Sequence, residues 1–333
     1  MVDGFINFNL NEKTPTIIKV IGVGGGGGNA VEYMYEKGIC DVDFVICNTD
    51  YQALRNSPIP CKIQLGKELT AGHGAGNNPA MGEKSAQERL ADIEAILKKD
   101  TRMAFITAAM GGGTGTGAAP VIAKLSKDMG ILTVGIVSVP ARFEGPKRLD
   151  QARDGLRRLK DHVDCLIVID NEKIKSIYGS QTISQAFAKA NDVLNIAAKG
   201  IAEIITLPGY INVDFADVRT VMTDSGVAIM GAAQASGEDR AIRAITEALE
   251  SPLLNNNDIL GAKDILLNIT SGTDEITMDE MSQITSHIIR KVGNNAAVIW
   301  GVGTDPDLGD AVSVTIIATG FPTGDIELFG EEN

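Results

Sequence analysis

Two glycine-rich segments are the places where backbone groups of this chain could hold phosphate. One, GVGGGGGNA, spans residues 22–30, and the other, MGGGTGTG, spans residues 110–117; each follows an apolar run. Glycine loses more backbone freedom on folding than any other residue, so two such segments indicate a functional need for it. Without a Cβ, backbone N–H groups can approach an anion closely, and a helix N-terminus adds partial positive charge. The segments therefore predict a phosphate-binding site.

The first segment by itself also fits a dinucleotide-binding turn. Gly22, Gly24 and Gly27 match the pattern G-x-G-x-x-G, and Asp50 follows the next apolar run. A nicotinamide-dependent oxidoreductase is therefore one alternative, and a tight turn without a ligand is another. Neither explains residues 110–117, which are not a P-loop either, because no lysine follows the glycines. Backbone amides and threonine hydroxyls would have to cradle the phosphate.

A polar pair and a carboxylate pair further along the chain could complete such a site. Asn191 and Asp192 interrupt an apolar stretch, where a buried carboxylate could accept from both N1–H and N2–H₂ of guanine but not from adenine. A solvent-facing turn is the alternative. Asp214 and Asp217 are three residues apart at a predicted helix start and so face one side. They could orient a water molecule, position a cation, or act only as an N-cap and a first-turn acid.

Alternating strands and helices must position these residues. Apolar runs predict strands at 17–23, 42–48, 61–65, 103–108, 131–139 and 163–169, with helices at about 29–37, 80–98 and 146–162. This alternation predicts a parallel, doubly wound sheet. Ligands of such sheets bind outside the carboxyl ends of the strands, where both glycine segments lie.

A long helix and a second α/β unit follow. Residues 182–205 repeat apolar positions at the helical period, and Thr182 and Gln185 have capping-box spacing. We expect this helix to be a spine between two domains. Beyond it, strands are predicted at 227–235, 265–270, 296–303 and 312–319, and helices at 238–249 and 277–291. The last two strands are close in sequence and predict an antiparallel hairpin.

The composition limits the partners of the protein. The chain has 333 residues, 44% of them hydrophobic, and a formal net charge of −13, which argues against a general nucleic-acid or anionic-membrane surface. No apolar run reaches the roughly 18 residues of a membrane span, so cytoplasmic residence is expected. The three histidines are scattered, and the cysteines lack metal-site spacing and are expected mainly as buried thiols. The four cysteines are Cys40, Cys47, Cys61 and Cys165.

Together with GGGTGTG at 111–117, six motifs in order resemble the tubulin/FtsZ family of GTPases. They are IKVIGVGGGGGNAV (18–31), GAGNNP (74–79), FEGPKR (143–148), ANDVL (190–194), NVDFADVRTVM (212–222) and ATG (318–320). The resemblance implies an α/β fold, with a Rossmann-like parallel-sheet GTPase domain, a long central helix and a smaller α+β domain with a mixed sheet. The implied division is a flexible segment 1–15, a GTP-binding domain 16–181, the helix 182–206, a C-terminal domain 207–320 and an end segment 321–333.

The resemblance also implies roles for individual residues. The implied phosphate contacts are Gly25, Gly26, Gly27, Gly28, Asn29, Gly112, Gly113, Thr114, Gly115 and Thr116. Ala75 and Gly76 would line the γ-phosphate side, with Asn48 and Asp50 facing the same site. Glu144 and Arg148 would contact the ribose end, although an i,i+4 ion pair at a helix start is the alternative. Asn191 and Asp192 would contact the base, on which Phe187, one turn earlier, could stack.

The implied activity is GTP-dependent assembly into head-to-tail filaments at the division site of bacterial cells. Asn212, Asp214 and Asp217 would enter the nucleotide site of the next subunit, so that hydrolysis of GTP to GDP and phosphate requires assembly. Mg²⁺, with a monovalent cation as an alternative, would accompany the triphosphate. A nucleotide-binding scaffold that does not hydrolyse is a further alternative, which the retained aspartates disfavour.

Some features depart from the family pattern. Ala109, Val139 and Ala141 stand where the family usually has glycine, lysine and phenylalanine; we expect nucleotide binding to survive and the rate or loop mobility to differ. The adaptor-binding peptide and linker usual in the family are not found before Asn333. The expected partners are therefore copies of the chain, without nucleic acid or direct membrane insertion.

Overall fold

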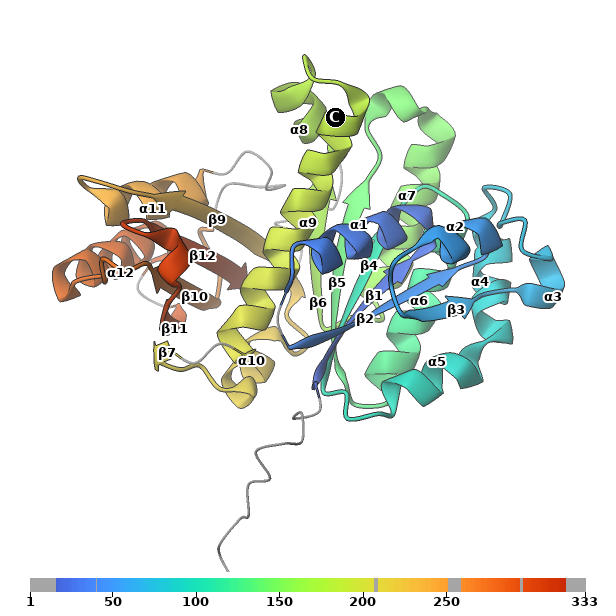
Figure 1. Cartoon of the computed structure of the whole chain (residues 1–333), viewed down its shortest axis with the longest axis horizontal. Coiled ribbons are helices and arrows are strands. Elements are labelled where there is room, and N and C mark those ends of the chain that lie inside the picture. The colour runs from blue at the N-terminus through green and yellow to red at the C-terminus, as the bar shows by residue number, and fades with distance from the viewer. Residues whose placement is uncertain (1–15, 40, 207–208, 251–258, 294–295, 322–333) are drawn as a thin grey trace, which may run out of the picture.

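The computed structural model describes residues 16–39, 41–206, 209–250, 259–293 and 296–321. Two sheets lie on either side of a central helix, α9 (Ile183–Thr206), as Figure 1 shows. The predicted flexible segment 1–15, Cys40 and residues 322–333 of the predicted end segment lie outside the described residues. Among the described residues, no helix combines the length and the apolar character needed to cross a membrane.

The first sheet is parallel throughout and has the order β3-β2-β1-β4-β5-β6-β8. Its strands are β1 (Ile18–Val23), β2 (Val42–Asn48), β3 (Cys61–Gln64), β4 (Met103–Ala109), β5 (Leu132–Val139), β6 (Cys165–Asp170) and β8 (Gly226–Val227). Helices cover both faces, which is why β1 and β4 are continuous apolar runs. The order reverses between β1 and β4, so the loops that leave their carboxyl ends diverge and open a crevice.

Helices of this part pack in two layers. One face of the sheet carries α1 (Gly24–Glu36) and α9, and the other carries α4 (Pro79–Glu88), α5 (Leu90–Leu97), α6 (Thr114–Asp128) and α7 (Pro146–Lys160). Short elements complete the edge near the strand ends. These are α2 (Tyr51–Asn56), α3 (Lys67–Thr70), the 3₁₀ turn η1 (Arg142–Glu144) and α8 (Asn171–Tyr178).

The structure confirms the long helix and its predicted cap. The Gln185 amide donates to Thr182 Oγ1 at 3.4 Å, and the Thr182 amide donates to Gln185 Oε1 at 3.1 Å. One hydrophobic core runs through α9, because it contains Phe105 of the first sheet, Ile201 of the helix, and Leu266 and Ile317 of the second sheet. The helix therefore has apolar contacts with both sheets.

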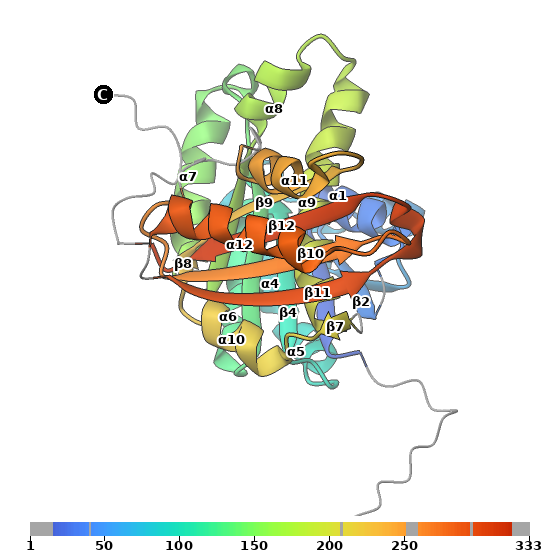
Figure 2. The same ribbon diagram turned by 90° about the vertical axis from the view of Figure 1, so that its left-hand side faces the viewer.

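The second sheet is mixed and has the order β7-β11-β10-β12-β9. The elements beyond α9 are β7 (Gly209–Ile211), α10 (Phe215–Met222), β9 (Ile229–Ala235), α11 (Arg240–Leu249), β10 (Asp264–Ser271), α12 (Met278–Val292), β11 (Ala297–Thr304), the 3₁₀ turn η2 (Pro306–Leu308) and β12 (Val312–Thr319). Figure 2 shows α11 and α12 over the outer face of this sheet. Their apolar side chains form a hydrophobic core with that face, separate from the core that runs through α9.

The predicted hairpin between the last two strands is wrong. β11 and β12 do not pair, because β10 lies between them, parallel to β11 and antiparallel to β12. The connection instead crosses the end of β10: the Asp305 amide donates to the Ser271 carbonyl, and the Gly272 amide donates to the Ala311 carbonyl. These bonds to β10 replace the tight turn that the short separation in sequence suggested.

Two helix boundaries also differ from the prediction. α1 begins at Gly24 rather than near Asn29, so the glycine segment itself forms the first turns. The predicted helix 80–98 breaks at Arg89, whose backbone leaves helical geometry, and α5 then directs Ile93 and Leu97 into the core. Space explains two of these helical glycines, because a Cβ on Gly26 would collide with the Ala109 methyl and one on Gly27 with the Thr107 carbonyl of β4.

Helix α6 approaches α4 so closely that Gly117 tolerates no side chain. A Cβ there would collide with the carbonyl of Pro79 and lie 2.7 Å from the Glu83 amide. We expect Gly117→Ala to lower the free energy of unfolding by about 1–3 kcal/mol, measured by urea denaturation. Gly28→Ala is the matched control, because a Cβ at this helical glycine meets nothing within 4 Å. Equal stability of the two variants would contradict the packing argument.

Candidate functional site

A cavity of about 410 Å³ lies at the carboxyl ends of β1, β4 and β5, between the glycine segments and α9. It combines backbone-rich walls from the glycine segments with polar and aromatic side chains. The residues that line it are Val23, Gly25, Gly26, Asn29, Ala109, Met110, Gly112, Gly113, Thr114, Gly115, Ser138, Pro140, Glu144, Arg148, Asn171, Phe187, Ala190, Asn191 and Leu194. The structure thus brings eleven predicted site residues into one cavity.

Two helices begin at this cavity. α1 starts at Gly24 and α6 starts at Thr114, and neither has a side-chain cap at its N-terminus. The first amides of a helix have no partner within the helix and carry partial positive charge. A hydrogen bond of 2.7 Å between the hydroxyls of Thr49 and Thr114 ties the end of β2 to the start of α6. This wall of the cavity is suited to an anion such as a polyphosphate.

Close packing shapes the phosphate-facing loops. A Cβ on Gly113 would lie 2.9 Å from the Ala75 methyl, and a Cβ on Gly26 would collide with the Ala109 methyl. Ala75 therefore lies against Gly113 without lining the cavity, and Gly76 adopts a φ of +58° in the same loop. Ala109, where the family usually has glycine, uses the space that Gly26 leaves free.

Other predicted phosphate-side residues have local structural partners. Thr116 is fully buried, and its hydroxyl accepts from the Gly111 amide at 2.8 Å. Asn48 accepts from the Asp50 amide at 3.2 Å, and Asp50 caps α2 by accepting from Gln52 and Ala53. None of these three side chains lines the cavity, nor do Gly27 and Gly28. The side chains of Asn48, Asp50 and Thr116 instead stabilise loops next to the residues that line the cavity.

The opposite wall carries Glu144, Arg148, Phe187 and Asn191. The predicted i,i+4 ion pair forms, with Arg148 Nη1 at 2.7 Å from Glu144 Oε2, and Glu144 Oε1 also accepts from the Ala141 amide at 3.0 Å. The ion pair is thus confirmed, and because both side chains also line the cavity, a ribose contact stays a prediction. Phe187 is 49% exposed, which leaves its ring face available to a planar ligand.

Asp192 lies next to the cavity, one residue beyond Asn191, and is half-buried rather than directed to solvent. Its Oδ1 accepts a hydrogen bond of 3.0 Å from the hydroxyl of Tyr33 on α1. Burial and this hydrogen bond raise the pKa of Tyr33, which favours the protonated phenol that donates. The sequence did not indicate this partner.

Asn171 was not among the predicted site residues; it begins α8 directly after β6. It lines the cavity, and its Oδ1 is buried without a hydrogen-bond partner among the described residues. A signal was present, because the polar residues Asp170 and Asn171 follow the apolar run 163–169 at the same edge of the sheet. Asn171 is thus a candidate polar contact for a ligand.

The predicted trio Asn212, Asp214 and Asp217 lies beyond the far end of α9. Asp214 Oδ1 accepts from the Asp217 amide at 2.9 Å, and the Asp214 amide donates to Asp217 Oδ2 at 3.4 Å, which forms a capping box at the start of α10. Asn212 accepts from the Gly209 amide at 2.6 Å. All three are exposed. The last cavity-lining residue of α9 is Leu194 and the helix ends at Thr206, so roughly 18 Å of helix separates the cavity from the segment that carries this trio.

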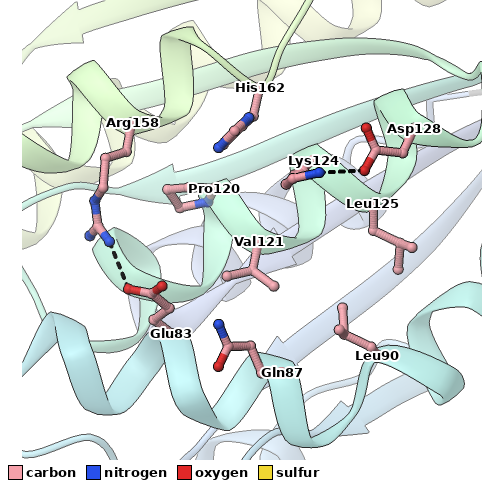
Figure 3. A pocket seen from close by; sticks show the side chains of 10 residues that line it. All are labelled: Glu83, Gln87, Leu90, Pro120, Val121, Lys124, Leu125, Asp128, Arg158 and His162. Carbon is pink, nitrogen blue, oxygen red and sulfur yellow. Dashed lines mark hydrogen bonds and ion pairs between the residues drawn. The ribbon is translucent and has the colours of Figure 1, made fainter.

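A second hollow, of about 320 Å³, lies between α4, α5, α6 and α7 (Figure 3). Ion pairs at its rim join Arg158 to Glu83 at 2.8 Å and Lys124 to Asp128 at 2.6 Å. No predicted site residue lines it. The cavity at the switch point is therefore the candidate functional site.

Comparison with known proteins identifies the class. Residues 17–179 match the family model described as "Tubulin/FtsZ family, GTPase domain". Residues 226–322 match the model described as "FtsZ family, C-terminal domain". The fold and the cavity at its switch point thus define a GTPase of the tubulin/FtsZ class. The oxidoreductase alternative is set aside.

Individual relatives narrow the assignment. "Cell division protein FtsZ" of Porphyromonas gingivalis is 49% identical to this chain, in a match that covers 96% of this chain and 71% of that protein. The protein of the same name from Coxiella burnetii is 48% identical, in a match that covers 94% of this chain and 82% of that protein. The solved structure "FtsZ dimer, empty (M. jannaschii)" superposes with a TM-score of 0.88 at 42% identity, covering 95% of this chain and 91% of that one. The chain belongs to the FtsZ family of cell-division GTPases, and its nucleotide is a guanine nucleotide.

If the exposed ring of Phe187 stacks on the base, removing the ring should weaken nucleotide binding. We expect Phe187→Ala to weaken GDP binding by about 1–3 kcal/mol, because base stacking on an aromatic ring is worth that much. The thermal midpoint should change little, since half of the ring is exposed. Tyr35→Ala is the control, because Tyr35 is also exposed but packs against Phe44 with ring centroids 5.6 Å apart. Titration calorimetry measures both, and equal GDP affinity of the two variants would contradict stacking.

Proposed function

We propose that the cavity holds one guanine nucleotide, with its phosphates between the starts of α1 and α6 and its base beside α9. The converging helix N-termini support the phosphate end, through the amides of Gly25, Gly26, Gly112, Gly113 and Gly115. Glu144 and Arg148 are the proposed ribose contacts. Phe187, Asn191, Asp192 and the additional residue Asn171 are the proposed base contacts.

Mg²⁺ is proposed to arrive with the triphosphate. Mg²⁺ takes oxygen ligands, keeps several waters, and usually uses phosphate oxygens with one or two protein groups. The phosphate wall fits such an ion, because the side chains of Asn29 and Thr114 provide oxygen atoms along it. Bound Mg²⁺ would neutralise charge on the phosphates. A monovalent cation beside Asp214 and Asp217 is the alternative role for those carboxylates.

The single observation that carries the proposed mechanism is the separation of the carboxylates from the cavity. Asp214 and Asp217 are exposed and lie beyond the far end of α9, so they are poorly placed to reach the nucleotide of their own chain. In a head-to-tail contact, the same residues of the next subunit would face it. There they would orient and polarise the water that attacks the γ-phosphate, since phosphoryl transfer depends mainly on positioning and charge stabilisation.

The proposed assembly is a filament. A head-to-tail contact that does not close generates an open polymer, and solved relatives include an FtsZ dimer and a GTPγS-bound CetZ2 protofilament from Haloferax volcanii. Loss of the γ-phosphate after hydrolysis would remove contacts at the interface and weaken it. Action at the division site together with adaptor proteins of division is proposed from the family alone.

The charge of Asp214 is separable from its capping role. Asparagine is as good an N-cap as aspartate, so Asp214→Asn should retain the bond to the Asp217 amide, the thermal midpoint and GTP-dependent assembly. We expect GTP turnover per assembled subunit to fall on the order of 10²-fold. Phosphate release and sedimentation on the same sample measure the two quantities.

Asp305→Asn is the matched control for this substitution. Asp305 caps η2 by accepting from the Asp307 amide at 3.1 Å, and it lies in neither the cavity nor the 212–217 loop. Its turnover should equal that of the unmodified chain. Normal turnover of assembled Asp214→Asn would overturn the shared-site mechanism.

A site divided between subunits predicts a concentration dependence. Below the assembly concentration, GTP turnover per subunit should fall steeply on dilution, because each cavity then lacks its neighbour's carboxylates. Light scattering recorded with phosphate release should show both signals disappearing together, and ATP should support neither. Turnover that stays constant on dilution would show that one chain contains the whole site.

A further inference from the structure

A hydrogen bond links the two helices that would hold opposite ends of the nucleotide. The Tyr33 hydroxyl on α1 donates to Asp192 Oδ1 on α9 at 3.0 Å, and both side chains are half-buried. α1 crosses and packs against α9 (Figure 1). The glycine-rich start of α1 lies on the phosphate side of the cavity, whereas α9 contributes Phe187 and Asn191. The bond therefore joins the two sides of the site.

The position of Tyr33 along α1 places it at the end of the cavity. Gly25 and Asn29 line the cavity and are four residues apart, and Tyr33 follows after four more. Residues at this spacing lie on one face of a helix. Asp192 is next to the cavity-lining Asn191 on the partner helix. Neither Tyr33 nor Asp192 lines the cavity itself, so the pair lies just beyond its wall, between α1 and α9 and next to the proposed base contacts.

We infer that Tyr33 is a positioning residue that sets the preference for guanine by orienting the Asp192 carboxylate. This inference rests on the proposed contact between Asp192 and the base. An ionised carboxylate has about four acceptor positions on its two oxygens. Guanine N1–H and N2–H₂ would use one position on each oxygen, which leaves a second position on Oδ1 for Tyr33. All three hydrogen bonds are compatible, and Tyr33 restricts rotation of the carboxylate before the base arrives.

The surroundings of Tyr33 hold its ring in place. Lys37 Nζ lies 5.3 Å from the ring centroid, and the neighbouring Met34 is fully buried in the core under α1. Burial and the bond to Asp192 raise the pKa of Tyr33, in the direction that favours the donating phenol. A hydrogen bond to a charged acceptor is stronger than one between neutral groups. The ring and the hydroxyl of Tyr33 thus each have a partner.

The test compares GDP with IDP, whose base lacks the 2-amino group. GDP and IDP do not require hydrolysis, so titration calorimetry on the full chain reports binding alone. We expect Tyr33→Phe to reduce the ratio of GDP to IDP affinity by roughly three- to tenfold, while IDP affinity changes less. A Tyr33 with only a structural role would leave that ratio unchanged. Tyr35→Phe, a substitution two residues away on the same helix, should keep the ratio of the unmodified chain.

Two further measurements distinguish a wrong role for Tyr33 from a wrong base contact for Asp192 and from misfolding of the variant. Thermal unfolding should show Tyr33→Phe folded, because the substitution removes a single hydroxyl. Asp192→Asn should lose the guanine preference; if it keeps the preference, the proposed base contact itself is wrong. If Asp192→Asn loses the preference but Tyr33→Phe retains it, only the role of Tyr33 is overturned. Tighter GDP binding by Tyr33→Phe would also overturn it, because the hydroxyl would then compete with the base.

Discussion

The close approach of two helix N-termini to neighbouring strand ends is the constraint on which the structure depends. Gly27 of α1 lies against the Thr107 carbonyl of β4, and Gly115 of α6 lies against the Ala109 carbonyl at the end of β4, with no space for a Cβ at either position. This packing directs the free amides of both helices into one cavity. A chain with a net charge of −13 can thereby present a local anion site built mainly from backbone groups.

Helix α9 gives the rest of the molecule its geometry. Its apolar positions contact both sheets, so the two halves share a hydrophobic core that includes Phe105 and Leu266. The same helix keeps the exposed Asp214 and Asp217 far from the cavity. The proposed division of the site between subunits would follow from this one long, well-packed helix, and the Tyr33–Asp192 hydrogen bond adds a contact between that helix and α1 beside the proposed base contacts.

Local patterns predicted much of the fold. β1 and β4 are continuous apolar runs because a parallel strand is covered on both faces, and α9 has both the helical period and a capping box. The start of α1 at Gly24 was missed, because intrinsic propensity argues against a helix of glycines; close packing on Thr107 outweighs it. The hairpin of β11 and β12 was wrong because strand pairing is non-local, and β10 takes the position between them.

The sequence by itself determined the chemistry available to this protein: backbone amides for phosphate, a carboxylate for a base, and a second carboxylate pair at a helix start. These properties follow from residue type and short spacing, which are local. Only the tertiary structure decided that Asn171 joins the cavity, that Tyr33 holds Asp192, and that Asp214 lies far from its own cavity. Strand order and helix packing determine those relations, because they bring together or separate residues that are distant along the chain.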